Sequence, residues 1–498
     1  MVSAEKIKRI YRGLYIWRDE GGVGTFNYVP RFGKTLVGLH AIHNVLKKHK
    51  INVLVVVPSE IIKYHWEASI TNFDANLTNN VSIYSIHKLA NMPLKRYGLV
   101  IFDEIHKYLT GVVTSRTFIS ICNNSTFKLG LTGSPPKENS DAGNLLKKYV
   151  PIIDTISESV AIANNWISKF VEYNYVLPME KADAEIYTLY TRHIKETFEI
   201  FDGAAQWLNN TKFGDYNIRF TFNSDYDVIK ACQYGANLIT GKKLRGKEVA
   251  ELYAMSKGWS NNLDLSIQYN ENLNNFYSPI NLIERVKKFN HFVKLRNELI
   301  NDNSTKLVAI TNILNLRPTE KVMIFTESIN FAEIVNEVIN NNNLGKSAVY
   351  HSQIKKQAFI DPMTGDYIRK VNGEIKEVGK TVIKRKLIEG FRANKLNILV
   401  SVKSLDEGFD ISDVTMIIIS SGTINPIQQK QRTARAKTID PNNINKNAII
   451  INLVFDDITY NGELMQSRDM AKLINRQYHY EHLPKWVKSI SNYLLKNT

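Results

Sequence analysis

The chain has very little cysteine and no long apolar run. Its 498 residues contain two cysteines, Cys122 and Cys232, which are far apart and lie in no CxxC motif. This scarcity excludes a disulfide framework and a cysteine zinc site, and it fits a reducing compartment. The longest apolar runs are the length of a strand, and the basic N-terminus lacks an apolar signal core. We therefore expect a cytoplasmic protein, in the host cytoplasm if it is viral, that is not secreted and has no membrane partner.

Acidic residues are scarce relative to basic ones. Lys and Arg number 64 against 48 Asp and Glu, for a formal net charge of +16. Such an excess favours a polyanionic partner, nucleic acid above all, because cations that neutralise phosphates release bound counterions. A charge bias that only aids solubility stays open from charge alone.

Two regions of the chain show the strand and helix rhythm of α/β domains. Short β-branched runs such as Val53 to Val57 and Leu99 to Phe102 alternate with helical patterns, and the same rhythm returns after residue 300. Continuous apolar strands separated by helices indicate parallel sheets covered on both faces. The stretch between the two regions is rich in aromatic residues and lacks a strand rhythm, so we expect a mostly helical linker or insertion there. The predicted divisions are 1–178, 179–300, 301–455 and 456–498, the last a helical tail.

Turn signals predict a hairpin inserted in the second α/β region. Asp361-Pro362 and Asn372-Gly373 flank short alternating segments, so we expect the hairpin over about 360–380. The tail interleaves aromatic residues such as Trp486 with lysines. An amphipathic helix packed on the second domain and a nucleic-acid contact are both open for it.

A Gly33-Lys34-Thr35 tripeptide follows a short strand-like segment and opens a helix. Backbone N–H groups from Arg31 to Thr35 can therefore cradle phosphate oxygens at the helix N-terminus. In such a loop Lys34 reaches the β- and γ-phosphates and Thr35 reaches Mg²⁺. The full pattern has glycine five positions before Gly33, where this chain has Tyr28. The tripeptide alone would more often be a coincidence.

An acidic pair follows the most apolar strand of the first half. Asp103 and Glu104 come directly after Leu99 to Phe102. Two adjacent carboxylates repel each other without a cation, so we assign Mg²⁺ to Asp103 and the orientation of an attacking water to Glu104. A helix N-cap is the structural alternative for Asp103. We expect His106 to hydrogen-bond to the end of the next strand, where Thr132 and Ser134 could link the nucleotide site to the second domain.

The second half carries basic residues at helical spacing. Arg432 and Arg435 stand at i and i+3, which predicts one side of a helix, where they can face a γ-phosphate as an arginine finger. A basic helix face exposed to solvent would be the better reading of this segment in isolation.

In this order, the motifs resemble those of the superfamily 2 helicases and translocases. Seven segments carry the resemblance, and in chain order they correspond to motifs I, Ia, II, III, IV, V and VI. The segments are Gly33-Lys34-Thr35, Val57-Pro58-Ser59, Asp103 to His106, Thr132-Gly133-Ser134, Ile324-Phe325-Thr326, Glu407 to Asp410, and Gln428 to Arg435. The pattern is most similar to that of the DNA translocases that act in branch migration, repair and restriction. We expect this chain to be encoded by a phage. The chain departs from the family at Tyr28, at Ile105 in motif II and at Gln431 in motif VI.

The resemblance implies two RecA-like domains that close on ATP and Mg²⁺, with nucleic acid across their tops. It implies a catalytic role for Gln428 beside the arginines, and nucleotide contacts for Gly408 and Asp410. It further implies backbone contacts to nucleic acid at Ser59, His87, Thr326 and Ser401. We expect DNA rather than RNA, with replication or repair proteins as further partners. No glutamine within Glu5 to Thr25 marks an adenine-reading motif, which leaves the base specificity open.

Three other functions stay open. The chain could be an RNA helicase, a scaffold that binds ATP and nucleic acid but barely hydrolyses, or the motor subunit of a restriction complex. No RRM- or KH-type module supports RNA. No nuclease signature is visible, so in a restriction complex another chain would cut the DNA.

Overall fold

The computed structural model describes residues 3–93, 95–210, 222–239, 279–402, 411–423, 425–460, 463–477 and 482–495. It divides into two compact units. One comprises Met1–Leu177, Lys306–Val454 and Asp469–Thr498, and the other comprises Pro178–Thr305 and Phe455–Arg468. The first unit contains both large sheets, so the candidate site lies within it.

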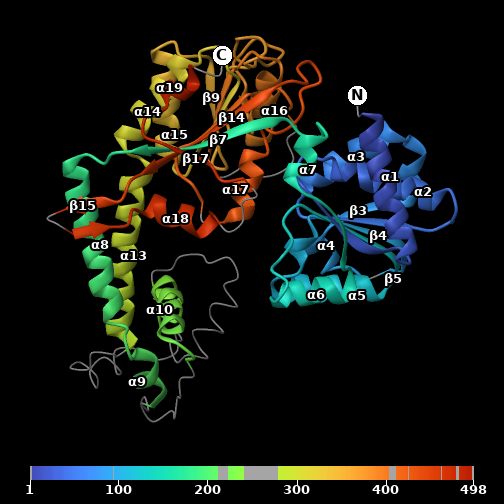
Figure 1. The fold of residues 1–498 in the computed structure, drawn as a ribbon, viewed down its shortest axis with the longest axis horizontal. Coiled ribbons are helices and arrows are strands. Elements are labelled where there is room, and N and C mark those ends of the chain that lie inside the picture. Colours follow the sequence, from blue (N-terminus) through green and yellow to red (C-terminus); the bar gives the residue numbers. More distant parts are fainter. Residues whose placement is uncertain are drawn as a thin grey trace. The chain divides into compact units, whose positions relative to one another are not determined.

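Sheet A has six strands in the order β3-β2-β4-β5-β1-β6, and all its pairings are parallel. The strands are β1 (Val23–Tyr28), β2 (Val53–Val57), β3 (Val81–Ser85), β4 (Tyr97–Asp103), β5 (Ser125–Thr132) and β6 (Ile152–Ile156). The helices around them are α1 (Ala4–Asp19), α2 (Lys34–Leu46), α3 (Glu60–Phe73), η1 (Ala75–Asn80), α4 (Ile86–Leu89), η2 (Ile105–Tyr108), α5 (Val112–Asn123), α6 (Asp141–Tyr149) and α7 (Glu158–Ala163). Figure 1 shows this part in blue to cyan.

Alternate residues of the central strands enter two separate cores. Leu99 and Ile101 of β4 pack with residues of α1, α2 and α3, whereas Val100 and Phe102 pack with residues of α5 and α6. Side chains alternate between the faces of a strand, so a strand that is apolar at every position is buried on both sides. The predicted parallel sheet with helices on both faces is therefore confirmed for this part.

Sheet B has the order β17-β7-β14-β13-β8-β12-β9, and the pairings among β8, β9, β12, β13 and β14 are parallel. Its strands are β7 (Lys169–Leu177), β8 (Val322–Thr326), β9 (Ser347–Tyr350), β12 (Ile398–Val402), β13 (Met416–Ile419), β14 (Asn447–Phe455) and β17 (Lys485–Val487). The associated helices are α14 (Ser304–Leu316), α15 (Ile329–Asn341), α16 (Lys380–Arg392), α17 (Pro426–Thr433) and α19 (Ser491–Leu494). The prediction of a second α/β sheet is also confirmed.

Sheet B draws strands from outside the predicted range 301–455. Strand β7, which the boundary at 178 assigns to the first domain, lies in sheet B, and so does β17 from the tail. The boundary at 178 is corrected on this point. Strand pairing between residues far apart in sequence leaves no local signal, which is why the alternation of strands and helices did not reveal it.

The second unit is mainly helical, as expected for the middle of the chain. It contains α8 (Lys181–Glu199), α9 (Ala204–Asn210), α10 (Asp225–Ile239) and α13 (Pro279–Asn301). Helices α8 and α13 pack along each other, and His193 stacks on Phe292 with their ring centroids 4.5 Å apart. The antiparallel strands β15 (Ile458–Tyr460) and β16 (Glu463–Met465) from the tail also belong to this unit.

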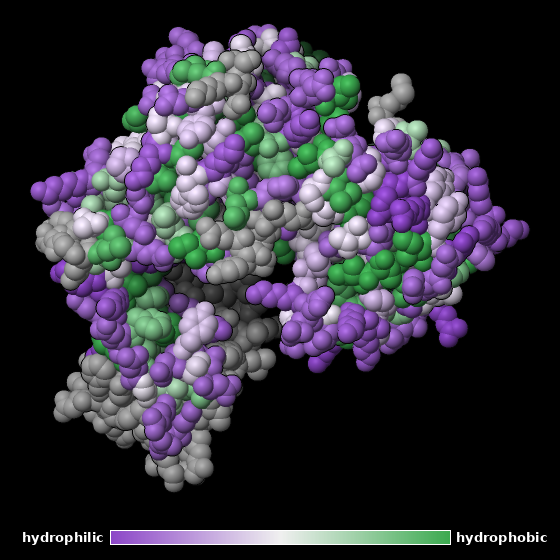
Figure 2. Space-filling view, in the orientation of Figure 1, coloured by the Kyte–Doolittle hydropathy of each residue, from purple (hydrophilic) through white to green (hydrophobic). Residues whose placement is uncertain are grey.

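The predicted hairpin and tail are both partly different from their sequence description. Strands β10 (Gln357–Ala358) and β11 (Glu377–Val378) pair antiparallel around the expected segment. The tail contains the helix α18 (Arg468–Gln477) and α19, and in addition the three short strands β15, β16 and β17. Among the described residues, none of the helices combines the length and apolarity needed to cross a bilayer. The face in Figure 2 is mostly hydrophilic, with smaller hydrophobic areas.

Candidate functional site

The Gly33-Lys34-Thr35 tripeptide lies between β1 and α2. Gly33 is the N-cap of α2 and has a φ of 104°, and Lys34 is the first helical residue. Arg31 also has a positive φ, 73°. A residue other than glycine in this conformation is uncommon, so the loop has a specific, constrained path. Its backbone N–H groups gather at the start of α2, where the partial positive charge of a helix favours phosphate.

The acidic pair lies at the end of β4, two strands away from β1 in the sheet. Asp103 is its last residue, and Glu104 follows in the left-handed conformation with a φ of 51°. The Lys34 Nζ lies 3.2 Å from the Glu104 Oε1. The loop after β1 and the turn after β4 therefore meet at the carboxyl edge of sheet A, as the sequence predicted.

The two carboxylates have opposite electrostatic environments. Burial and the neighbouring charge of Glu104 raise the pKa of Asp103 to about 6. Burial also acts to raise the pKa of Glu104, but the charges of Lys34 and His106 outweigh it and lower that pKa. The Trp66 Nε1 donates a 2.8 Å hydrogen bond to the Asp103 Oδ2. A cation near Asp103 would relieve the repulsion between the carboxylates of Asp103 and Glu104.

The residues predicted to couple the sites lie beside the acidic pair. The His106 Nδ1 lies 2.9 Å from the Thr132 Oγ1, and the same hydroxyl accepts a 3.0 Å hydrogen bond from the Ser134 backbone N–H. Burial lowers the pKa of His106, while the charge of Glu104 acts in the opposite direction. Strand β5, which ends at Thr132, pairs with β4, so the contact follows from adjacent strands.

Tyr28 occupies a structural position that the sequence did not reveal. Its hydroxyl donates a 2.5 Å hydrogen bond to the Asp154 Oδ2, and Arg9 forms a 2.6 Å ion pair with the Asp154 Oδ1. The Tyr28 ring is fully buried, stacked on Phe26 and edge-on to Phe32. Tyrosine thus replaces the expected glycine because α1, β1 and β6 pack around it. No local pattern linked Arg9, Tyr28 and Asp154.

Arg432 lies in the core of the part built on sheet B. It is fully buried, and its Nη2 donates a 3.0 Å hydrogen bond to the Glu327 Oε1. Helix α17 ends at Thr433, so Arg435 lies in the turn that follows and not on the predicted helix side. Gln428 is in α17 and is half-buried. Glu327 was missed, although an acidic residue directly after a strand is the signal that identified Asp103.

The four residues predicted to contact nucleic acid fall into two groups. Ser59 caps α3 through its hydroxyl, and His87 is exposed on α4. Thr326 and Ser401 are fully buried, so the structure corrects their assignment as surface contacts. They belong to β8 and β12, which are buried at every position.

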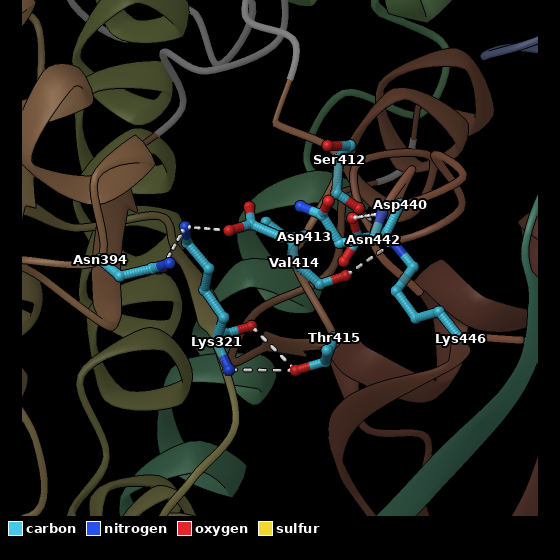
Figure 3. Close-up of polar contacts among 9 residues, drawn as sticks. All are labelled: Lys321, Asn394, Ser412, Asp413, Val414, Thr415, Asp440, Asn442 and Lys446. Carbon is cyan, nitrogen blue, oxygen red and sulfur yellow. Dashed lines mark hydrogen bonds and ion pairs between the residues drawn. The ribbon is translucent and has the colours of Figure 1, made fainter. Parts of the chain in front are cut away.

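Gly408 and Asp410 lie outside the described residues, but the segment that follows them is firmly held. The Lys446 Nζ donates to the backbone oxygens of Ser412 and Val414, at 2.6 and 3.1 Å. The Lys321 Nζ lies 2.6 Å from the Asp413 Oδ2. Figure 3 shows these contacts around Ser412 to Thr415. Two lysines therefore fix the chain between residue 411 and β13.

Comparisons with known proteins agree with this architecture. Residues 368–439 match the helicase conserved C-terminal domain. A Schizosaccharomyces pombe protein named as an ATP-dependent DNA helicase, fml2, is 28% identical over 173 residues, which are 34% of this chain and 18% of that protein. The aligned region is thus less than a fifth of the relative's length.

Two solved structures align with most of this chain. The structure of S. cerevisiae Dbp5 bound to RNA and ADP BeF3 aligns over 99% of this chain and 97% of its own, with a TM-score of 0.51 and 11% identity. The Pyrococcus furiosus Hef helicase domain aligns over 91% and 97%, with a TM-score of 0.46 and 15% identity.

Two RecA-like parallel sheets, one with the Gly33-Lys34-Thr35 loop beside an acidic pair, form a fold that this chain shares with Dbp5. The helicase domain match and the Schizosaccharomyces pombe relative agree with the resemblance to superfamily 2 helicases that the motifs predicted.

Proposed function

We propose that the chain is an ATP-dependent motor that hydrolyses ATP with Mg²⁺ to move along or remodel DNA. The observation that carries the proposal is the 3.2 Å approach of Lys34 to Glu104 at the start of α2. It brings a phosphate-binding lysine, a helix N-terminus and an acidic pair to one sheet edge.

The residues at this edge fit a nucleotide with its metal ion. A Cβ atom on Gly133 would lie 2.9 Å from the Tyr28 backbone oxygen and 3.2 Å from the Lys34 Nζ, so only glycine leaves the edge open there. The raised pKa of Asp103 reflects a carboxylate that a divalent cation would stabilise. When bound, Mg²⁺ neutralises charge that develops on the transferred phosphoryl group.

Each residue at this edge has a separate proposed role in binding or hydrolysis. Lys34 and the N–H groups of the loop hold the phosphates, while Thr35 and Asp103 hold the cation. Glu104, whose lowered pKa keeps it ionised, orients the attacking water. Arg435 and Gln428 are proposed to complete the site, and Gly408 and Asp410 to contact the nucleotide. Arg432 contributes through its buried pair with Glu327, which fixes the end of β8 beside α17.

One observation favours DNA over RNA as the substrate. The relative from Schizosaccharomyces pombe is named as a DNA helicase. The excess of basic residues, +16 in formal charge, supports a polyanion but does not distinguish the two. The exposed His87 and the hydroxyl of Ser59 are the proposed backbone contacts, and such contacts are largely independent of sequence.

The test is ATP hydrolysis by the full chain with single-stranded DNA, duplex DNA, forked DNA or RNA, and with none. We expect hydrolysis that is stimulated by nucleic acid, most strongly by one of the DNA substrates. Equal rates with all four and with none would contradict a motor. Tight ATP and DNA binding with negligible turnover would support the scaffold instead, and stimulation by RNA alone would change the substrate.

A further inference from the structure

The segment inserted between β9 and α16 contains the antiparallel pair of β10 and β11 and two further antiparallel bridges. One bridge joins Ile360 to Tyr367, and the other joins Arg369 to Ile375. The Ile368 backbone N–H donates to the Phe359 oxygen at 3.1 Å, which extends the first pairing. Because directly opposed residues share a face and positions 367 and 369 are two apart, all four paired side chains lie on one face.

This face is open to solvent, whereas the opposite face is packed. Ile360, Tyr367 and Ile375 are 48%, 42% and 45% exposed. Phe359 and Ile368, which alternate with them, pack on the core beside sheet B. An exposed sheet face that carries two isoleucines, a tyrosine and an arginine is unusual for a surface with no partner.

The charges around the face are unbalanced. Three of the carboxylates are paired with lysines: Glu377 with Lys356, Glu374 with Lys370 and Asp361 with Lys386. The remaining cations of the segment are Lys355, Arg369, Lys376 and Lys380, against the single acid Asp366. Among the described residues, no ion pair neutralises these four. Outside its ion pairs, the insert therefore carries more positive than negative charge.

The insert is also held in a fixed shape. The Lys386 Nζ forms a 2.9 Å ion pair with the buried Asp361, and the Asp361 Oδ1 accepts a 3.0 Å hydrogen bond from the Met363 N–H. Pro362 packs so closely on Gly390 that a Cβ there would lie 2.6 Å from the proline. A preformed surface loses little entropy when a ligand binds.

We propose that this face binds single-stranded nucleic acid, with a base stacked on Tyr367 and phosphates beside Arg369 and the unpaired lysines. The inference rests on the proposed function and adds a contact outside the helicase motifs. Aromatic side chains on a sheet with surrounding cations are the usual platform for unpaired bases. The unpaired cations favour a polyanion over a protein partner.

The test is the affinity of the full chain for fluorescein-labelled oligothymidylate, measured by anisotropy without nucleotide. Stacking of one base is worth about 1–3 kcal/mol, so Tyr367→Ala should weaken binding roughly 5- to 150-fold. Tyr367→Phe keeps the ring and should bind as wild type. Arg369→Ala should weaken binding and lower the salt dependence by about one phosphate contact. Ile334→Ala, which removes a similarly exposed side chain from α15, is the matched control and should have no effect.

Wild-type affinity in Tyr367→Ala, or an equal loss in Tyr367→Phe, would overturn the proposal. So would an equal loss of affinity for a blunt duplex, because its bases are not free to stack. The result is separable from the motor assay. If ATP turnover is not stimulated by nucleic acid but Tyr367→Ala still binds oligothymidylate more weakly, only the proposed motor function is contradicted. If turnover is stimulated and Tyr367→Ala binds normally, only this inference fails.

Discussion

The Lys34 Nζ lies 3.2 Å from the Glu104 Oε1, and this contact joins the loop after β1 to the turn after β4. Both side chains are largely buried, with 11% and 21% of their surface exposed. The pairing helps to keep Glu104 ionised in a place where burial alone would favour its neutral form. Phosphate oxygens that bind Lys34 would compete for this lysine and release the carboxylate toward water.

We predict that Glu104→Gln lowers ATP turnover by about 100-fold or more, because an amide keeps the shape but cannot accept a proton from water. Lys34→Ala should also weaken ATP binding, since it removes the phosphate contact. Both are measured as steady-state phosphate release in the presence of DNA. Glu60→Gln, which changes an exposed acid on α3, is the control. Wild-type turnover in both site variants would refute the assignment.

The contact of His106 with Thr132 predicts a coupling defect. Thr132→Val removes the hydroxyl that contacts His106 and accepts from the Ser134 N–H, whereas Thr132→Ser retains it. We expect the ratio of DNA-stimulated to basal turnover to fall roughly 2- to 30-fold in Thr132→Val, in line with typical coupling energies. Thr132→Ser should keep most of the stimulation. Equal ratios in the two variants would show that the hydroxyl plays no part.

Tyr28 predicts that the consensus residue would be harmful. Tyr28→Gly restores the usual glycine but empties a fully buried site, so it should destabilise the protein by about 3–5 kcal/mol. Tyr28→Phe removes the hydroxyl, which donates to Asp154 and accepts from Arg9, and should cost about 1–3 kcal/mol. Urea unfolding followed by tryptophan fluorescence measures both. A Tyr28→Gly protein as stable as wild type would show that the ring is dispensable.

The ion pair of Asp361 with Lys386 predicts an acid-sensitive insert. Burial opposes ionisation of Asp361, but the hydrogen bonds from Lys386 and the Met363 N–H, together with the charge of Lys386, outweigh it and lower the pKa of the carboxyl. The stabilisation is therefore complete above the ordinary value of about 4 and is lost as the pH falls through the lowered pKa. The difference in melting temperature between wild type and Asp361→Asn should shrink from pH 6 toward about pH 3.

Asp366→Asn is the matched control for this pH dependence. It changes an exposed acid of the same turn that forms no ion pair among the described residues. Its melting temperature should follow that of wild type at each pH. A constant gap between wild type and Asp361→Asn would mean that the carboxylate charge is unimportant.

Much of the candidate nucleotide site was predictable from the sequence. Gly33 and Lys34 lie at the start of the helix that follows β1, Asp103 and Glu104 lie at the end of β4, and parallel strands present their carboxyl ends at one edge. The same reasoning predicted the contact of His106 with the neighbouring strand. It failed for Thr326 and Ser401, because a position in a strand does not tell which side chains reach the surface.

The sequence by itself determined the strand and helix rhythm, the acidic pair, the phosphate loop and the turns of the insert, since each depends on residues close together in the chain. Only the tertiary structure decided that β7 and β17 complete sheet B, that Tyr28 is held by Arg9 and Asp154, and that Arg432 is buried against Glu327. These contacts join residues 19 to more than a hundred positions apart. Their partners are selected by packing and by the cost of burying an unpaired charge, and neither leaves a local pattern.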